Sequence, residues 1–178
     1  MKVKNSTRLS YALMSRDDAE LFYELDQDEE VMRYINGGLI TTREYLNDVL
    51  LPRLDCYRNE AEGWGLWKVV ITETNQFIGW VLVRPMNFFS EQPEFDNIEL
   101  GWRFKQDSWG HGYATEAASS LKLAIKDLGK AKKISAIAFE ANKASTKIML
   151  KLGLTYIKTD IHNDPLGDHE VVFYELDI

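Results

Sequence analysis

The sequence predicts a single mixed α/β (α+β) domain in which helices cover a sheet. Its 178 residues suit one domain with a substantial core. The hydrophobic content of 45% and the aromatic content of 12% are typical of a folded globular protein. Strand-like and helix-like segments alternate along the chain without an internal repeat or a Gly/Ser-rich linker. We therefore expect one domain over residues 1–178.

The first third of the chain is mainly helical in pattern. Ala19, Leu21, Phe22 and Leu25 have the spacing of one helical face. The expected elements are a strand at 7–14, helices at 16–25 and 28–35, and a helix that starts at Thr41 or Thr42 and runs towards Tyr57. Pro52 lies inside the last helix, where a proline kinks or breaks the backbone.

The middle of the chain has the pattern of strands. Segments 64–72 and 77–84 are rich in Val, Ile and Trp, and residues 73–76 form a turn between them, which predicts a hairpin. After a loop at 86–93, a strand is expected at 97–105. Its alternation places Ile98, Leu100, Trp102 and Phe104 on one face, and Glu99, Gly101 and Arg103 on the other.

The last third begins with a glycine-containing loop at 107–112. Apolar residues then recur every three or four positions from Tyr113 to Leu128, and Gly129 follows, which predicts a helix. The remaining expected elements are a buried strand at 133–139, a helix capped by Asn142, and strands at 154–159 and 170–176.

Charge and composition exclude several classes of protein. The net charge of −7 disfavours binding to nucleic acid. An acidic surface would attract protonated amines, although it also serves solubility alone. No apolar run of membrane-spanning length and no signal peptide is recognised, and Cys56 has no partner for a disulfide. These features favour a cytoplasmic protein without membrane contact.

The loop before the 113–128 helix has the geometry of a phosphate site. Gly110 and Gly112 let the backbone approach a ligand, and the first N–H groups of a helix attract anions. A Walker loop is excluded because its lysine is missing. A dinucleotide fingerprint is excluded because Thr115 stands where its third glycine would be.

Several motifs together resemble the GNAT superfamily of N-acetyltransferases, and within it the ribosomal-protein-alanine N-acetyltransferase branch. They are Glu-Leu-Gly-Trp-Arg-Phe at 99–104, Trp-Gly-His-Gly-Tyr-Ala-Thr-Glu-Ala at 109–117, Asn-Lys-Ala-Ser at 142–145 and Lys-Leu-Gly-Leu at 151–154. The resemblance implies a mostly antiparallel sheet of about seven strands with helices on both faces. Its two central strands, at 98–104 and 133–139, would splay apart to admit the pantetheine arm of acetyl-CoA.

The resemblance also implies a set of residues that bind acetyl-CoA. Backbone groups near two aromatic residues would bond pantetheine, the glycine loop would hold the pyrophosphate, and two polar residues would line the other side. This set comprises Trp102, Phe104, Trp109, Gly110, His111, Gly112, Tyr113, Ala114, Thr115, Asn142 and Ser145.

Two residues are candidates for catalysis. Glu99 is the candidate base that takes a proton from the amine; alternatively, it pairs with Arg103 on the same face. Many members of the family carry a tyrosine acid where this chain has Met149. Ser145 is therefore the candidate donor to the thiolate; alternatively, it caps its helix. Asp164 is a second candidate for orienting the amine, or a solvated turn residue.

Substrate selection is expected away from the acetyl-CoA site. The expected walls are the helices at 16–57, the loop at 85–96 and the last hairpin. Acidic residues gather in two of these walls, and aromatic residues there line an amine site or belong to the core. The acidic residues are Asp26, Asp28, Glu29, Glu30, Glu91, Glu94 and Asp96, and the aromatic ones are Tyr34, Phe88 and Phe89.

The leading hypothesis is an enzyme that moves an acetyl group from acetyl-CoA to a primary amine of a peptide N-terminus or a small molecule. A non-catalytic acyl-CoA sensor with the same fold is the alternative, and a nucleotide-phosphate binder is a third. A monomer or homodimer is expected. His162, His169, Asp164 and Asp168 share a polar turn, but nothing else indicates a metal, and none is expected.

Overall fold

The computed structural model, which describes residues 1–178, contains a single seven-stranded sheet with the strand order β1-β2-β3-β4-β5-β7-β6. Every neighbouring pair is antiparallel except β4 and β5. The mostly antiparallel sheet expected from the sequence is confirmed. The strands are β1 (Leu9–Leu13), β2 (Gly65–Ile71), β3 (Gln76–Met86), β4 (Glu94–Phe104), β5 (Lys133–Ala138), β6 (Thr155–His162) and β7 (His169–Asp177).

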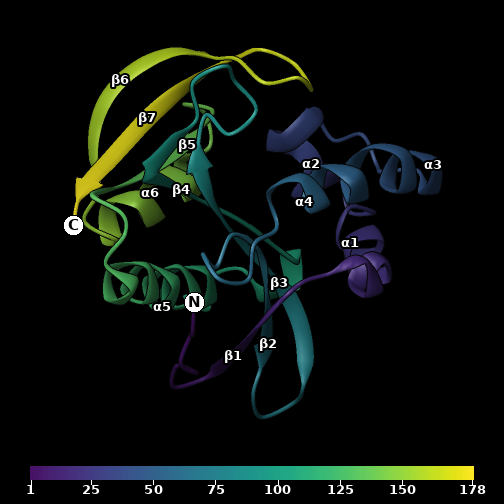
Figure 1. The fold of residues 1–178 in the computed structure, drawn as a ribbon. Helices are drawn as coiled ribbons and strands as arrows, with labels where there is room; N and C mark the ends of the chain where they lie inside the picture. Colours follow the sequence, from purple (N-terminus) through teal and green to yellow (C-terminus); the bar gives the residue numbers. More distant parts are fainter.

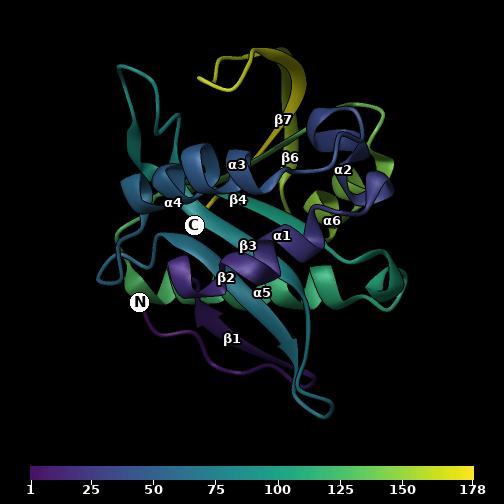
Figure 2. The same ribbon diagram turned by 90° about the vertical axis from the view of Figure 1, so that its right-hand side faces the viewer.

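Helices cover both faces of this sheet, as Figures 1 and 2 show. The helices after β4 and β5, at 113–128 and 143–151, lie on one face, and the helices of the first third of the chain lie on the other. The helices are α1 (Ala19–Leu25), α2 (Glu29–Asn36), α3 (Arg43–Tyr45), α4 (Leu51–Tyr57), α5 (Tyr113–Leu128) and α6 (Lys143–Lys151). None of them is long and apolar enough to cross a membrane.

Alternation along the central strands produces two hydrophobic cores. Val81 and Val83 of β3 face the larger core, which contains Ala117, Leu121 and Ile125 of α5. Their neighbours Trp80 and Leu82 face the smaller core beneath α1 and α4. In β4, Ile98, Leu100 and Phe104 are buried in the larger core and Trp102 packs against it, as the sequence predicts.

The central strand pair separates after three residues. β4 and β5 are paired only at Asn97↔Lys133, Ile98↔Ile134 and Glu99↔Ser135. Beyond this point β4 continues to Phe104 and remains paired with β3, while β5 continues to Ala138 and remains paired with β7. The edges of the two strands that face each other therefore carry unpaired backbone groups, and the expected splay is confirmed.

The helix expected up to Tyr57 is interrupted rather than broken at Pro52. α3 gives way to a π-helical turn at Leu46–Leu50, and α4 then starts with Pro52 in its first turn. In the π-helical turn the N–H of Leu51 bonds the carbonyl oxygen of Leu46, five residues back rather than four, so the hydrogen-bond pattern changes just before the proline. The widened turn thus accommodates the residue that the sequence pattern identified as a problem.

Some strand boundaries differ from the expected ones. β1 is shorter than 7–14, while β3 extends to Met86 and β4 starts at Glu94 rather than at 97. A register shift between Pro85 and Met86 lets the pairing continue to Glu94, so the connecting loop is shorter than expected. This loop, residues 87–93, is called the β3–β4 loop below.

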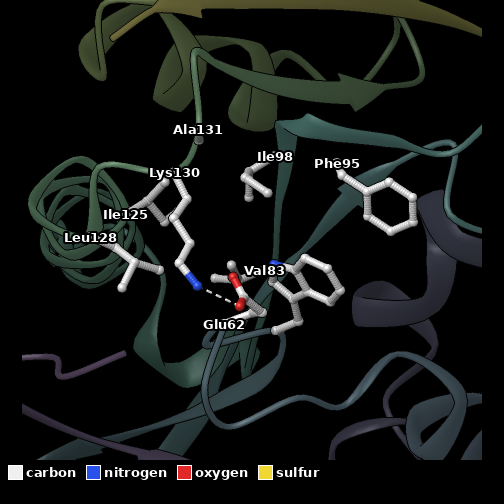
Figure 3. A pocket seen from close by; sticks show the side chains of 9 residues that line it. Glu62, Val83, Phe95, Ile98, Ile125, Leu128, Lys130 and Ala131 are labelled. Atoms are coloured by element: carbon white, nitrogen blue, oxygen red, sulfur yellow. Dashed lines mark hydrogen bonds and ion pairs between the residues drawn. The ribbon is translucent and has the colours of Figure 1, made fainter.

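A small cavity lies at the C-terminal end of α5 (Figure 3). It has a volume of about 20 Å³ and is lined mainly by apolar side chains such as Val83, Ile98 and Ile125. An ion pair between Lys130 and Glu62, with a nitrogen–oxygen distance of 2.5 Å, borders it. A space of this size holds about one water molecule, so it is a packing defect and not a ligand site.

Candidate active site

The glycine loop lies between the end of β4 and the start of α5. Gly110 and Gly112 have φ values of +79° and +80°, a left-handed conformation that disfavours other residues. A Cβ atom on Gly110 would meet no atom within 4 Å, so the backbone there is open to a ligand. Gly112 is the N-cap of α5 and supplies no side-chain hydrogen bond. The first N–H groups of this helix therefore remain free to bind an anion.

The loop is fixed at both of its ends. The indole Nε1 of Trp109 donates to the carbonyl oxygen of Phe104 at 2.9 Å, which ties the loop to β4. Arg8, just before β1, donates from Nη1 to the carbonyl oxygen of His111 at 3.0 Å. The Arg8 guanidinium carbon also lies 4.4 Å from the ring centroid of Tyr113. The side chains of Trp109 and His111 are themselves exposed.

Arg8 reaches the loop because Glu116 of α5 holds it. The Glu116 carboxylate accepts from the backbone N–H of Arg8 at 2.9 Å, from its Nε at 2.7 Å and from the Ser6 hydroxyl at 2.8 Å. Partial burial alone would raise the pKa of Glu116, but the hydrogen bonds from Ser6 and Arg8 outweigh it and keep this pKa below its ordinary value. The carboxylate is thus held ionised against the arginine.

On the other side of the gap, Asn142 caps α6. Its Oδ1 accepts from the backbone N–H of Ser145 at 3.1 Å, as the sequence predicts. The alternative in which the Ser145 side chain caps the helix is wrong, because Asn142 does so. The Ser145 hydroxyl is half-buried and makes no hydrogen bond within the protein. Met149 is fully buried in the larger core, so this position serves packing.

Glu99 lies at the point where β4 and β5 separate, and its side chain is only 6% exposed. Its partner is not Arg103 but Arg84 of β3, whose Nε donates to Glu99 Oε2 at 2.7 Å. Arg84 sits directly across the sheet from Glu99 and is itself buried. Burial alone would lower the pKa of Arg84, but the Glu99 carboxylate raises it above its ordinary value, so the guanidinium stays charged.

Arg103 instead pairs with Asp26 at the end of α1. Asp26 is buried and also accepts from the Thr41 hydroxyl at 3.0 Å. The expected acidic cluster at 26–30 is therefore divided, because Asp26 is sealed inside and Asp28 caps α2 by accepting from the N–H of Glu30 at 2.9 Å. Neither of these two carboxylates is available to attract an amine.

Aromatic side chains surround the Arg84–Glu99 pair. Tyr57 of α4 is buried, and this burial raises its pKa to about 12, so its hydroxyl stays protonated. Phe88 and Phe89 of the β3–β4 loop pack edge-on against Tyr57, with ring centroids 6.0 and 6.1 Å away. Of the expected aromatic residues, Phe88 and Phe89 are thus partly buried and pack against the smaller core, and Phe89 also contacts Arg84. Tyr34 lies apart from them in α2, with non-helical backbone angles.

The second acidic group lines an open pocket of about 710 Å³ between the β3–β4 loop and the β6–β7 hairpin. Glu91, Glu94 and Asp96 contribute to it, together with His162. Two of these carboxylates already have partners. Glu94 accepts from the side-chain amides of Asn87 and Asn97, each at 2.7 Å, and Asp96 pairs with Lys132 at 2.9 Å.

The polar turn at 162–169 forms no metal-ligating cluster of three or more side chains. His162 and His169 lie edge-on against Phe173 and Phe139, with ring centroids 6.4 and 5.3 Å apart. Asp164 pairs with Arg53 of α4, so it is not a solvated turn residue.

Three residues of this region do not stand out in the expectations from sequence: Arg8, Arg53 and Arg84. The strand pattern did contain a signal for Arg84, because it ends a run of otherwise apolar residues in a buried strand. A buried arginine requires a carboxylate partner, and Glu99 was the unpaired candidate on the neighbouring strand. No local signal identifies Arg8 or Arg53, whose partners lie 108 and 111 residues away in sequence.

The split parallel strand pair, the glycine loop and the helix without a side-chain cap give the geometry that suits an extended, phosphate-bearing ligand. The chain matches the family described as "Acetyltransferase (GNAT) domain" over residues 8–155 and therefore belongs to this family of acyltransferases. The predicted superfamily and enzyme class are thereby confirmed.

A curated relative is similar in sequence, and solved structures share the fold. The FsC-acetyl coenzyme A-N(2)-transacetylase of Aspergillus fumigatus is 29% identical over 158 residues, which cover 87% of this chain but only 66% of that protein. The ribosomal-protein alpha-N-acetyltransferase RimL in complex with coenzyme A has a TM-score of 0.75 at 13% identity, covering 99% of this chain and 97% of that one. The aminoglycoside acetyltransferase AAC(6')-Ib with coenzyme A has a TM-score of 0.75 at 15% identity, covering 95% and 94%.

Proposed function

We propose that this protein transfers an acetyl group from acetyl-CoA to a primary amine by direct attack within a ternary complex. The observation that carries the proposal is the opening between β4 and β5, which begins immediately after the buried Glu99 and runs along β4, the strand that leads into the glycine loop. A donor seated there would have its thioester beside a carboxylate held by Arg84. The similar proteins described above, whose names or bound ligand include coenzyme A, support this choice of donor.

The local structure fits acetyl-CoA in three ways. Unpaired backbone groups of β4 beside Trp102 and Phe104 can bond an amide-bearing arm as an added strand would. The loop from Gly110 to Gly112 and the first turn of α5, with Tyr113, Ala114 and Thr115, offer N–H groups to phosphate. The backbone N–H of Trp109, which the expected set also includes, already donates to the carbonyl oxygen of Gln106 at 3.1 Å. Asn142 and Ser145 line the opposite side. Bound acetyl-CoA supplies the activated acetyl group, and the protein contributes orientation and proton transfer.

Two side chains are assigned roles in the reaction, one as a base and one as a hydrogen-bond donor. Glu99 takes a proton from the ammonium form of the substrate, directly or through one water, so that a neutral amine can attack. The unengaged hydroxyl of Ser145 donates a hydrogen bond to the departing thiolate. As the C–S bond breaks, the proton that the attacking nitrogen loses passes to this sulfur, so the products are the amide and CoA thiol. Because a thiol has a pKa of about 8.5, the thiolate is a tolerable leaving group and this donor has a modest role. Much of the rate is expected from holding the reactants together.

The acceptor is a primary amine of a peptide N-terminus or of a small molecule. The acidic open pocket between the β3–β4 loop and the β6–β7 hairpin supports a cationic acceptor, because negative side chains raise the local concentration of protonated amines. Structurally similar proteins include a ribosomal-protein and an aminoglycoside acetyltransferase, so both kinds of amine belong in the test.

The test is release of free CoA from acetyl-CoA in the presence of peptides with N-terminal Ala or Ser, spermidine or an aminoglycoside. Turnover with one of these amines supports the proposal and identifies the acceptor class. Tight binding of acetyl-CoA by calorimetry, without turnover across a broad amine panel, contradicts the proposal and favours a sensor. Competition by ATP at the same site would point to a nucleotide-phosphate binder.

A further inference from the structure

A continuous series of contacts connects the β6–β7 loop to Glu99. Asp164 in this loop pairs with Arg53 of α4, and both side chains are 15% exposed. The guanidinium carbon of Arg53 lies 3.7 Å from the ring centroid of Phe89 in the β3–β4 loop. Arg84 lies on the same ring, with its guanidinium carbon 5.5 Å from the Phe89 centroid. Arg84 in turn donates a hydrogen bond to Glu99.

These contacts join three separate segments of the chain. Arg53 comes from α4, Phe89 from the β3–β4 loop and Asp164 from the β6–β7 loop, and the three segments are the walls expected to select the substrate. Both loops lie at the same end of the molecule in Figures 1 and 2, and both line the open acidic pocket. Arg53 contacts both loops: its charge pairs with Asp164, and its planar face lies on the ring of Phe89.

The chemistry of Arg53 suits this role. A guanidinium can bond a carboxylate with its edge while its face stacks on an aromatic ring, which an ammonium group cannot do equally well. Because the pair with Asp164 is largely buried, loss of either charge leaves the other without compensation. The β6–β7 loop would then be expected to move outward so that the remaining charge regains water.

We propose that Arg53 is a positioning residue for the acceptor site, which holds the β6–β7 loop and the β3–β4 loop in a fixed relation to Glu99. The inference rests on the proposed function, since it assigns the acceptor site to the space between these elements. Arg53 does not touch the acetyl-CoA loop. It acts on the acceptor and on the geometry of Glu99, through Asp164 on one side and through Phe89 and Arg84 on the other.

The first experiment needs no acceptor. Hydrogen exchange is measured on the wild type, on Arg53→Met and on Asp164→Asn. Faster exchange at 163–168 in both variants, with exchange at 113–128 unchanged, is the expected result. Asp55→Asn is the matched control, because Asp55 lies in the same helix and pairs with Arg16 at the surface, where the side chains are 44% and 54% exposed. Unchanged exchange at 163–168 in both variants would overturn the proposal.

The second experiment uses whichever amine the wild type acetylates. Misplacement of a reacting group by about 1 Å costs roughly a hundredfold in rate, so Arg53→Met is expected to lower kcat/KM for the amine by up to that factor. The KM for the amine should rise, because loss of contacts that bind the ground state and the transition state equally raises KM. The Kd for acetyl-CoA should stay within about twofold of the wild-type value. Asp55→Asn should match the wild type in both constants.

A conservative variant separates charge from stacking. Arg53→Lys keeps the attraction to Asp164 but loses the planar contact with Phe89, so it should restore slow exchange at 163–168 and only part of the amine KM. If Arg53→Met and Arg53→Lys both keep the wild-type KM for the amine, the proposal fails while the acetyltransferase function stands. If the wild type itself turns over no amine, the proposed function fails, and the exchange data still decide whether Arg53 holds the loops.

Discussion

Replacement of Glu99 by glutamine tests the base assignment most directly. Glu99→Gln keeps the shape of the side chain and one acceptor for Arg84 Nε, but it removes the negative charge next to a buried guanidinium. If Glu99 is the base, the variant should lose about 10²–10⁴-fold in kcat/KM near neutral pH. The loss should shrink as pH rises, because the amine then gives up its proton to solvent before it binds.

The same substitution also has a structural cost, which must be separated from the catalytic one. Removal of one partner of a buried ion pair typically destabilises a protein by about 3–5 kcal/mol, and the hydrogen bond retained by glutamine favours the lower end. In a domain of this size, 1 kcal/mol shifts the melting temperature by roughly 2–4 °C. The Tm of Glu99→Gln should therefore fall by roughly 6–12 °C, while the protein remains folded at room temperature.

The assay combines thermal unfolding with CoA release from pH 6 to 10, at temperatures well below the Tm of each variant. Glu24→Gln is the control, because Glu24 pairs with Lys105 at the surface and its side chain is 59% exposed. Arg84→Met provides the complementary measurement, since it disturbs the ion pair but leaves the carboxylate. The reasoning is refuted if Glu99→Gln keeps kcat/KM within about threefold of the wild type at neutral pH, because general base catalysis contributes far more than that.

Three further outcomes are expected. Gly110→Val forces a branched residue into left-handed backbone and should cost roughly 1–2 kcal/mol, as should Gly129→Val at φ +69°, but only the Gly110 variant should weaken acetyl-CoA binding by calorimetry. Because the folded-state pKa of Glu116 lies below its ordinary value of 4.5, its stabilising effect is fully present above that pH and is lost as pH falls through the lower folded value. In urea unfolding, the free energy of unfolding of Glu116→Gln should thus lie below that of the wild type by a constant amount near neutral pH, and this difference should disappear in acid. A difference that persists at the lowest pH contradicts a stabilising role for the Glu116 carboxylate. Met149→Ala should destabilise by about 2–5 kcal/mol through a cavity in the core, and an unchanged Tm would show that this site relaxes freely.

The sequence predicted the elements whose signals are local. Alternation along β4 placed Ile98 and Leu100 on the core face and Glu99 on the opposite face, and the structure confirms this. The left-handed conformations of Gly110 and Gly112 were likewise foreseeable, because glycine at these positions precedes a strongly patterned helix. Periodicity and glycine placement report on a few neighbouring residues, and that is sufficient for such features.

The contacts around the site were not predictable in the same way. Pairing of Glu99 with Arg103 was plausible, since the two residues share a face of one strand. In the structure, however, Arg84 lies directly opposite Glu99 on β3, while Arg103 reaches Asp26 from a different element. Strand register decides such partners, and a single sequence does not specify register. Pro52 illustrates a different limit, because local rules forbid it in a regular helix but do not reveal the π-helical turn that accommodates it.

The short junction between β4 and β5 also has a consequence for how long the protein survives. Only three residue pairs join the two halves of the sheet there. A ligand that bridges the gap would therefore add hydrogen bonds between the two halves that the protein alone does not form. Ligand at a hundredfold excess over its Kd stabilises a folded protein by about 2.7 kcal/mol. Protein filled with acetyl-CoA should therefore resist unfolding and proteolysis better than empty protein. With the proposed donor, the amount of folded protein in a cell would therefore rise and fall with the supply of acetyl-CoA.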